Sequence, residues 1–106
     1  MQNDELKQIF DDIITYLSLT SNKDELFNFL RDLLSENEIV EFSKRFEVAK
    51  LLEEKVSYKE IETKTSMSST TIARISKFLT GENAGYQNAI SKLKGVYSKH
   101  HEGHQS

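Results

Sequence analysis

Residues 56–79 of this chain, VSYKEIETKTSMSSTTIARISKFL, have the spacing of two short helices joined by a tight turn. The side chains expected to point inward are one helical turn apart in each helix, with one more in the turn. They are Ile61, Thr65, Met67, Ile72 and Ile75. This pattern predicts a helix-turn-helix, although Ser66 occupies a turn position where such motifs often have Gly.

The starts of both helices carry capping signals. Ser57 followed by Glu60 forms a capping box before the first helix, and Ser68 can cap the second. Because an N-cap contributes roughly 1 kcal/mol, two caps at this spacing define where the helices begin. The second helix is therefore predicted at residues 69–79.

The outward face of that second helix is small, hydroxylated and basic. It consists of Ser69, Thr70, Ala73, Arg74 and Lys77. Such side chains can approach base edges and phosphates in a DNA groove. A helical hairpin with a solvated polar face is the alternative interpretation.

Charge is distributed unevenly along the 106 residues, whose net charge is −3. Residues 1–56 hold 13 of the 17 acidic residues, whereas the 14 Lys and Arg residues divide equally between the two parts. Net positive charge is thus confined to the part with the helix-turn-helix, because few acidic residues lie there. Phosphate contacts require local Lys and Arg rather than a basic chain.

Composition limits the other functions. The chain has no Cys and no Pro, which predicts a mostly helical domain without a disulfide framework. An acidic, polar N-terminus and no apolar run near about 20 residues favour a cytoplasmic protein without membrane contact. The sequence contains no catalytic motif, so we expect no enzymatic activity and no cofactor. We interpret His100, His101 and His104 as part of a polar tail rather than a metal site.

Apolar periodicity predicts further helices on both sides of the motif, giving an all-α chain of about six helices. The predicted ranges are 4–19, 23–34, 36–54 and 84–96. We assign residues 1–97 to one helical domain and 98–106 to a polar tail, expected to be disordered. The apolar residues of 23–34 spread over more than one stripe, which favours a homodimer over a small monomeric bundle.

Two local features complete the pattern. Ser35 and Glu38 form another capping box, and Arg45 is expected to pair on the surface with Glu41 or Glu38. Gly81 follows the helix-turn-helix and is predicted to end its second helix in the left-handed conformation.

Residues 33–93 resemble the Trp repressor superfamily, in particular its YerC/YecD-type branch. The resemblance rests on "KRFEVAKLL", "SYKEI", "TTIARI" and a following Gly-Tyr pair. It implies an all-helical, intertwined homodimer that acts as a transcriptional regulator, a repressor, on double-stranded DNA. Two-fold symmetry would then place the recognition helices about 34 Å apart, one turn of the duplex. The alternative is a helical protein–protein interaction module that no longer binds DNA.

The resemblance also implies roles for individual residues. Base-facing positions are Ser69, Thr70 and Ala73, and phosphate-side positions are Ser68, Thr71 and Lys59. Charge alone adds Arg74, Lys77 and Lys64. Because the base-facing side chains cannot contact a guanine bidentately, DNA shape and water are expected to supply much of the specificity.

The resemblance places a possible effector pocket at Ser35, Arg45, Arg74, Ile75 and Phe78. In the Trp repressor the indole lies between two arginines, which Arg45 and Arg74 match. Two small residues of that ligand site are replaced here by the large, apolar Ile75 and Phe78. We therefore expect that the chain does not bind L-tryptophan.

Overall fold

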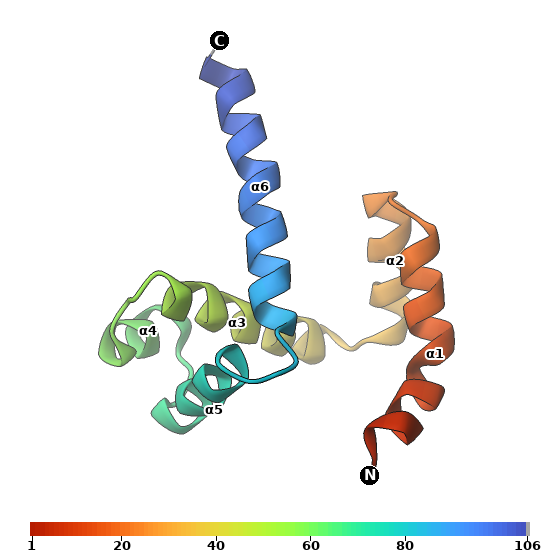
Figure 1. Cartoon of the computed structure of the whole chain (residues 1–106), viewed down its shortest axis with the longest axis horizontal. Helices are drawn as coiled ribbons and strands as arrows, with labels where there is room; N and C mark the ends of the chain where they lie inside the picture. The colour runs from red at the N-terminus through yellow and green to blue at the C-terminus, as the bar shows by residue number, and fades with distance from the viewer. Residues whose placement is uncertain (106) are drawn as a thin grey trace. The chain divides into compact units, whose positions relative to one another are not determined.

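A computed structural model describes the backbone of residues 1–105 and the side chains of residues 1–98. In this part of the chain all regular secondary structure is helical, as Figure 1 shows. The helices are α1 (Asn3–Leu19), α2 (Lys23–Leu33), α3 (Glu36–Glu53), α4 (Tyr58–Thr65), α5 (Ser69–Leu79) and α6 (Gly85–Gln105). The predicted all-α class with about six helices is confirmed.

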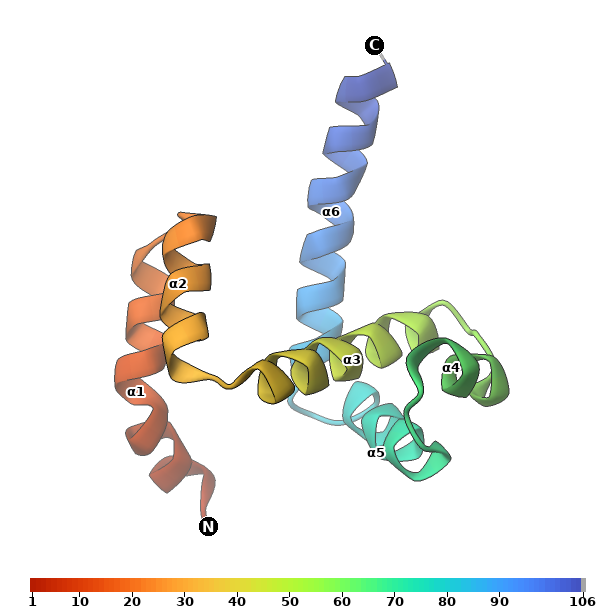
Figure 2. The same cartoon turned by 180° about the vertical axis from the view of Figure 1, so that it is seen from behind.

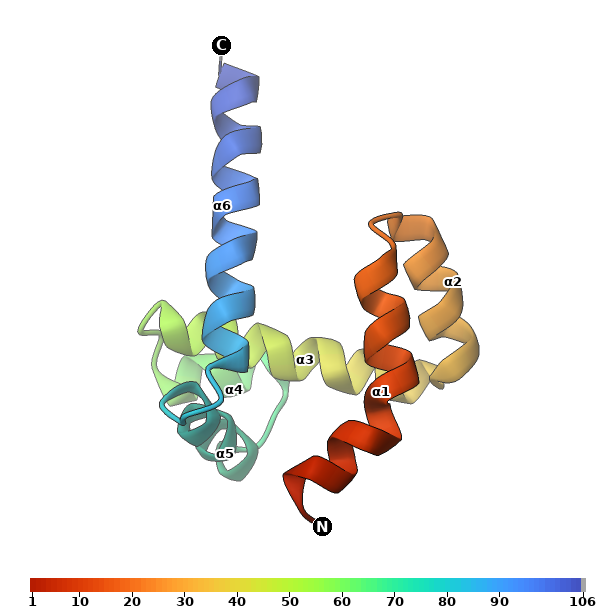
Figure 3. The ribbon, with the colours of Figure 1, turned by 45° about the vertical axis from the view of Figure 1, so that its right-hand side comes forward.

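The chain divides into two compact units, Met1–Ile39 and Val40–Ser106. The first unit contains α1 and α2, which run side by side in opposite directions (Figure 3). The Tyr16 and Phe29 rings lie 4.7 Å apart between them, and the Tyr16 hydroxyl donates a 2.7 Å hydrogen bond to Glu25 Oε2. This bond to a carboxylate raises the pKa of Tyr16.

The helical hairpin of α1 and α2 has no buried residue of its own. Its large apolar side chains remain accessible, for example Ile9 at 69% and Phe27 at 59%. An isolated pair of helices cannot enclose apolar stripes this wide. The broad apolar surface predicted for residues 23–34 is confirmed.

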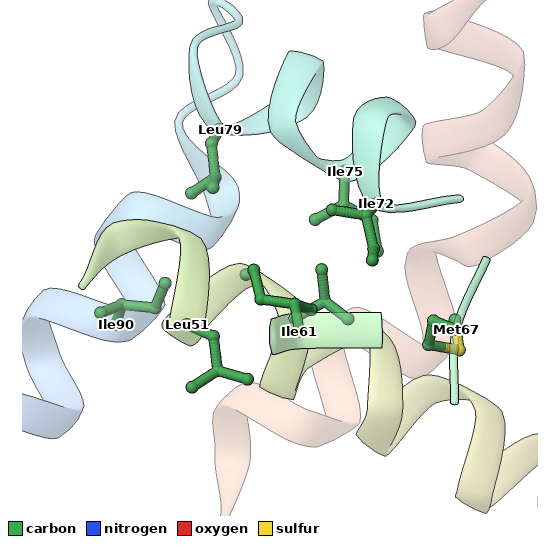
Figure 4. Packing of buried hydrophobic residues seen from close by; sticks show 9 residues of the cluster. Leu51, Ile61, Met67, Ile72, Ile75, Leu79 and Ile90 are labelled. Carbon is green, nitrogen blue, oxygen red and sulfur yellow. The ribbon is translucent and has the colours of Figure 1, made fainter. Parts of the chain in front are cut away.

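The second unit has a compact apolar core to which α3, α4, α5 and α6 all contribute (Figure 4). Ile61 and Ile72 are completely buried. The other members are Val48, Ala49, Leu51, Met67, Ile75, Leu79 and Ile90. All five side chains predicted to point inward in the helix-turn-helix are buried, including Thr65.

Serine side chains cap the N-termini of α3, α4 and α5. The Glu38 and Glu60 amides donate to Ser35 Oγ at 3.1 Å and to Ser57 Oγ at 3.2 Å. The Ser35 amide donates in return to Glu38 Oε1 at 2.9 Å, which completes the capping box. Hydrogen bonding to the Glu38 carboxylate, first from the Ser35 amide and then from the Ser35 side chain, lowers the pKa of Glu38.

The connection between α5 and α6 differs from the prediction. No glycine whose conformation the structure describes has a positive φ, so Gly81 does not adopt the left-handed conformation. Its amide instead donates to the Phe78 carbonyl at 3.2 Å, closing a tighter last turn. Ala84, just before α6, has the positive φ, 56°.

The last helix is longer than its apolar pattern. It begins at Gly85 and continues to Gln105, whereas the sequence pattern ends near residue 96 and assigns residues 98–106 to a disordered tail. The boundary at residue 98 therefore falls inside a helix. No proline interrupts this polar stretch. The side chains beyond Ser98 lie outside the described part.

Candidate nucleic-acid interface

The turn between α4 and α5 explains how Ser66 replaces the usual glycine. Ser66 adopts the left-handed conformation, with φ 60°, and its amide donates to the Glu62 carbonyl at 2.9 Å. The buried Thr65 hydroxyl donates to the Ile61 carbonyl at 2.7 Å and accepts from the Met67 amide at 3.2 Å. Hydrogen bonds on both sides thus hold the turn that orients α5 (Figure 2).

The beginning of α5 is capped as predicted. The Thr71 amide donates to Ser68 Oγ at 3.2 Å, and the Ser68 hydroxyl donates to Thr71 Oγ1 at 3.1 Å. Ser68 and Thr71, the two residues predicted to face a phosphate here, are therefore hydrogen-bonded to each other at the N-terminus of α5. Unpaired backbone amides and the helix dipole make such a terminus favourable for a phosphate.

The outward face of α5 borders an open surface depression. Five of the residues predicted to contact DNA line it together, namely Ser69, Thr70, Ala73, Arg74 and Lys77. Arg74 and Lys77 are exposed and form no ion pair with any described residue, so both charges are available to an anion. The predicted Lys59 and the additional Lys64 are exposed on α4, outside this lining.

Tyr58 also lines the depression, and our reasoning from the sequence missed it. It is the first residue of α4 and is 42% exposed. Its position was visible in the sequence, between the cap Ser57 and the basic Lys59. A tyrosine there offers an aromatic face and a hydroxyl to a sugar or phosphate.

The five residues of the predicted effector pocket have different environments. Ser35 lies in the first unit, where its hydroxyl caps α3. Arg45 pairs with Glu41 at 3.5 Å, as predicted, and its guanidinium lies 5.6 Å from the Phe42 ring centre. Ile75 is a core residue, only 3% exposed, while Phe78 on the same helix is 56% exposed. Arg74 faces the depression.

The described residues also bear on metal binding and on membrane insertion. Among them, no group of His, Asp and Glu is arranged to hold a metal ion. Within the described part of the chain, none of the helices is both long and apolar enough to cross a bilayer. The three histidines of the C-terminal segment lie outside the residues whose side chains are described.

Comparison with known proteins extends the resemblance beyond residues 33–93. The family model for the Trp repressor protein matches residues 5–94. The uncharacterized protein YerC of Bacillus subtilis is 35% identical over 94 residues, which cover 89% of this chain and 86% of YerC.

Solved structures agree with this assignment. A TrpR-like protein from Eubacterium eligens has a TM-score of 0.79 and 35% identity, covering 87% of this chain and 96% of its own. A Staphylococcus aureus protein, proposed to be a Trp repressor, has a TM-score of 0.78 and 28% identity. That match covers 89% of this chain and 95% of the S. aureus chain. The chain belongs to the Trp repressor family.

Proposed function

We propose that this chain is a sequence-specific, DNA-binding transcriptional regulator that acts in the cytoplasm as a homodimeric repressor. The proposal rests mainly on α5, which has one buried face and one exposed, basic face. Its inner face is buried in the core, while Arg74 and Lys77 on the outer face are exposed beside small and hydroxylated residues. A helix presented in this way can enter a major groove with its backbone close to the bases.

The chemistry of this face suggests how contacts would be divided. Arg74, Lys77 and Lys59 supply charge for phosphates, and Tyr58 adds a hydroxyl and a ring. Ser69, Thr70 and Ala73 meet the bases with short side chains, so we expect shape and bridging water to contribute to specificity.

The homodimer is supported by the exposed apolar surface of α1 and α2. A monomer would leave side chains such as Phe27 and Leu33 in water. A second copy of the hairpin offers the same apolar stripes, and a two-fold interface pairs identical surfaces. A dimer also supplies two recognition helices for a palindromic site.

We propose further that the regulator does not respond to L-tryptophan. Ile75 is packed among Ile61, Ile72 and Leu79 in the core, at the position where the family's ligand site has a small residue. Isothermal titration calorimetry with L-tryptophan should give no binding heat. Stoichiometric, micromolar binding would refute this part of the proposal.

A selection from a randomised duplex pool, at about 150 mM salt, tests DNA binding directly. We expect recovery of a palindrome with half-sites about one turn apart, without added ligand. Affinity for the recovered site should fall steeply with salt.

Two variants then test the surface. Arg74→Ala should weaken duplex binding and make the plot of log affinity against log salt concentration less steep, by an amount equal to about one phosphate contact. Lys94→Ala removes an exposed charge from α6 and should leave both the affinity and this slope unchanged. Equal binding by wild type and Arg74→Ala would count against the groove assignment.

The net charge of −3 and the exposed apolar hairpin favour one alternative, a protein–protein interaction module that has lost DNA binding. A folded dimer that enriches no sequence and shows no salt-dependent duplex binding would support that alternative.

A further inference from the structure

A second cavity, also open to solvent, lies where α5 ends and α6 begins. Its volume is about 500 Å³, and it is lined by Phe78, Gly81, Glu82, Asn83, Gly85 and Tyr86. It shares no lining residue with the depression on the outer face of α5. Only Phe78 belongs to the five residues aligned with the family's tryptophan site. We propose that this cavity binds a small aromatic amine, with its ring against Phe78 and Tyr86 and its ammonium group on the Glu82 carboxylate.

Hydrogen bonds hold the walls of the cavity in place. Gln87 Nε2 donates to the Leu79 carbonyl, which ties α6 to the end of α5. The Thr80 hydroxyl donates to the Lys77 carbonyl at 3.2 Å. The Tyr86 ring is nearly parallel to that of Phe46, with centres 6.3 Å apart, so α3 supports this wall from behind. These contacts fix the end of α5 relative to the start of α6, the two segments that line the cavity.

The two glycines leave space in the lining. A Cβ at Gly85 would meet nothing within 4 Å, so the missing side chain opens the cavity at the start of α6. A Cβ at Gly81 would lie 3.4 Å from the Lys77 carbonyl oxygen, where the loop passes close to α5. Phe78 and Tyr86 both line this space, and an aromatic lining suits a flat ring.

Charge defines the class of ligand. Glu82 is the only charged residue found in the lining, and no Lys, Arg or His lines the cavity among residues 1–98. A carboxylate ligand would meet Glu82 without a compensating cation. An ammonium group would meet the carboxylate, and the aromatic residues of the lining also attract cations. The family's tryptophan site, with its two arginines, has the opposite preference.

The exposed Phe78 supports the same assignment. It is 56% exposed although it lies on α5 between the core residues Ile75 and Leu79. A ring seated in the cavity would cover this apolar surface. Because Phe78 is on α5 and Tyr86 is on α6, one ligand would contact both helices.

The probe for this proposal is 2-phenylethylamine, with L-phenylalanine as a matched compound that adds only a carboxylate. Titration of the full-length ¹⁵N-labelled protein, followed by amide NMR, should shift the Gly81 and Gly85 resonances. For so small a ligand we expect a Kd of about 0.1–1 mM. L-Phenylalanine should bind at least about tenfold more weakly, since its carboxylate faces Glu82.

Two substitutions locate the site. Glu82→Gln should weaken 2-phenylethylamine binding about fivefold or more, because the ammonium loses its charged partner. Glu54→Gln, which removes an exposed carboxylate outside the lining, should bind as the wild type does. No shift with about 5 mM amine, shifts confined to other residues, or equal binding by wild type and Glu82→Gln would each overturn the proposal.

Discussion

Replacement of Ile75 by alanine tests whether this position is part of the core rather than the wall of a ligand pocket. Ile75 is 3% exposed and packs in the cluster that contains Ile61, Ile72 and Leu79. Ile75→Ala removes three carbon atoms from an almost fully buried site. Ile-to-Ala changes of this kind cost 2–5 kcal/mol when the cavity does not collapse, so we expect a loss of about 3 kcal/mol.

Phe78→Ala provides the control on the same helix. Phe78 loses more carbon atoms but is 56% exposed, so much of its ring is already in water. Its removal should cost about 1 kcal/mol or less. A difference of about 2 kcal/mol between the two variants therefore reports burial rather than helix propensity, because both changes introduce alanine.

Urea unfolding followed by circular dichroism measures both values. All samples should have the same protomer concentration, since the measured stability of a dimer depends on that concentration. A loss below about 1 kcal/mol for Ile75→Ala would refute the reasoning, because it would mean that the site lacks a packed environment. L-Tryptophan that stabilised the wild type would contradict it independently.

Three further changes test local features. Ser66→Gly should raise the free energy of unfolding by roughly 0.5–1 kcal/mol in the same assay, because glycine adopts the positive φ without strain. Ser68→Ala should lower it by about 1 kcal/mol, since the Thr71 amide loses its acceptor. Ser35→Ala should raise the pKa of Glu38 only part of the way toward its ordinary value, because alanine keeps the backbone hydrogen bond, the larger cause, and loses that of the hydroxyl; NMR titration of the carboxyl measures the change. Because folding lowers this pKa, the wild-type capping box stabilises above the ordinary Glu range, and that contribution disappears as pH falls through the folded-state pKa.

Local signals were sufficient to predict most of the second unit. Ser57 and Ser68 are short-range acceptors for amides three residues later, so a capping pattern specifies a helix start without tertiary information. The inward positions are equally local, since side chains one turn apart must share a face. The predicted α5 boundaries, 69–79, therefore agree with the structure.

Other features depend on how segments meet in space. Gly81 was the obvious candidate for a positive φ, yet the chain adopts it at Ala84, where α6 begins. Tyr58 was overlooked because it precedes its neighbours in the depression by more than ten residues along the chain. The cavity beside Phe78 likewise combines the ends of two helices. The periodicity of one segment does not indicate which residues of another segment will lie next to it.

Amphipathic periodicity also specifies that a face is apolar without specifying which chain covers it. In the second unit Ile90 of α6 is covered by the core, but Val96 and Tyr97 on the same helix remain more than half exposed. In the first unit the exposed apolar side chains extend along both α1 and α2. Burial of these side chains would contribute roughly 25 cal/mol for each Å² removed from water, a gain that the pair of helices does not obtain by itself. This uncovered surface is why we propose a second copy as the partner, with each hairpin completing the core that the other lacks.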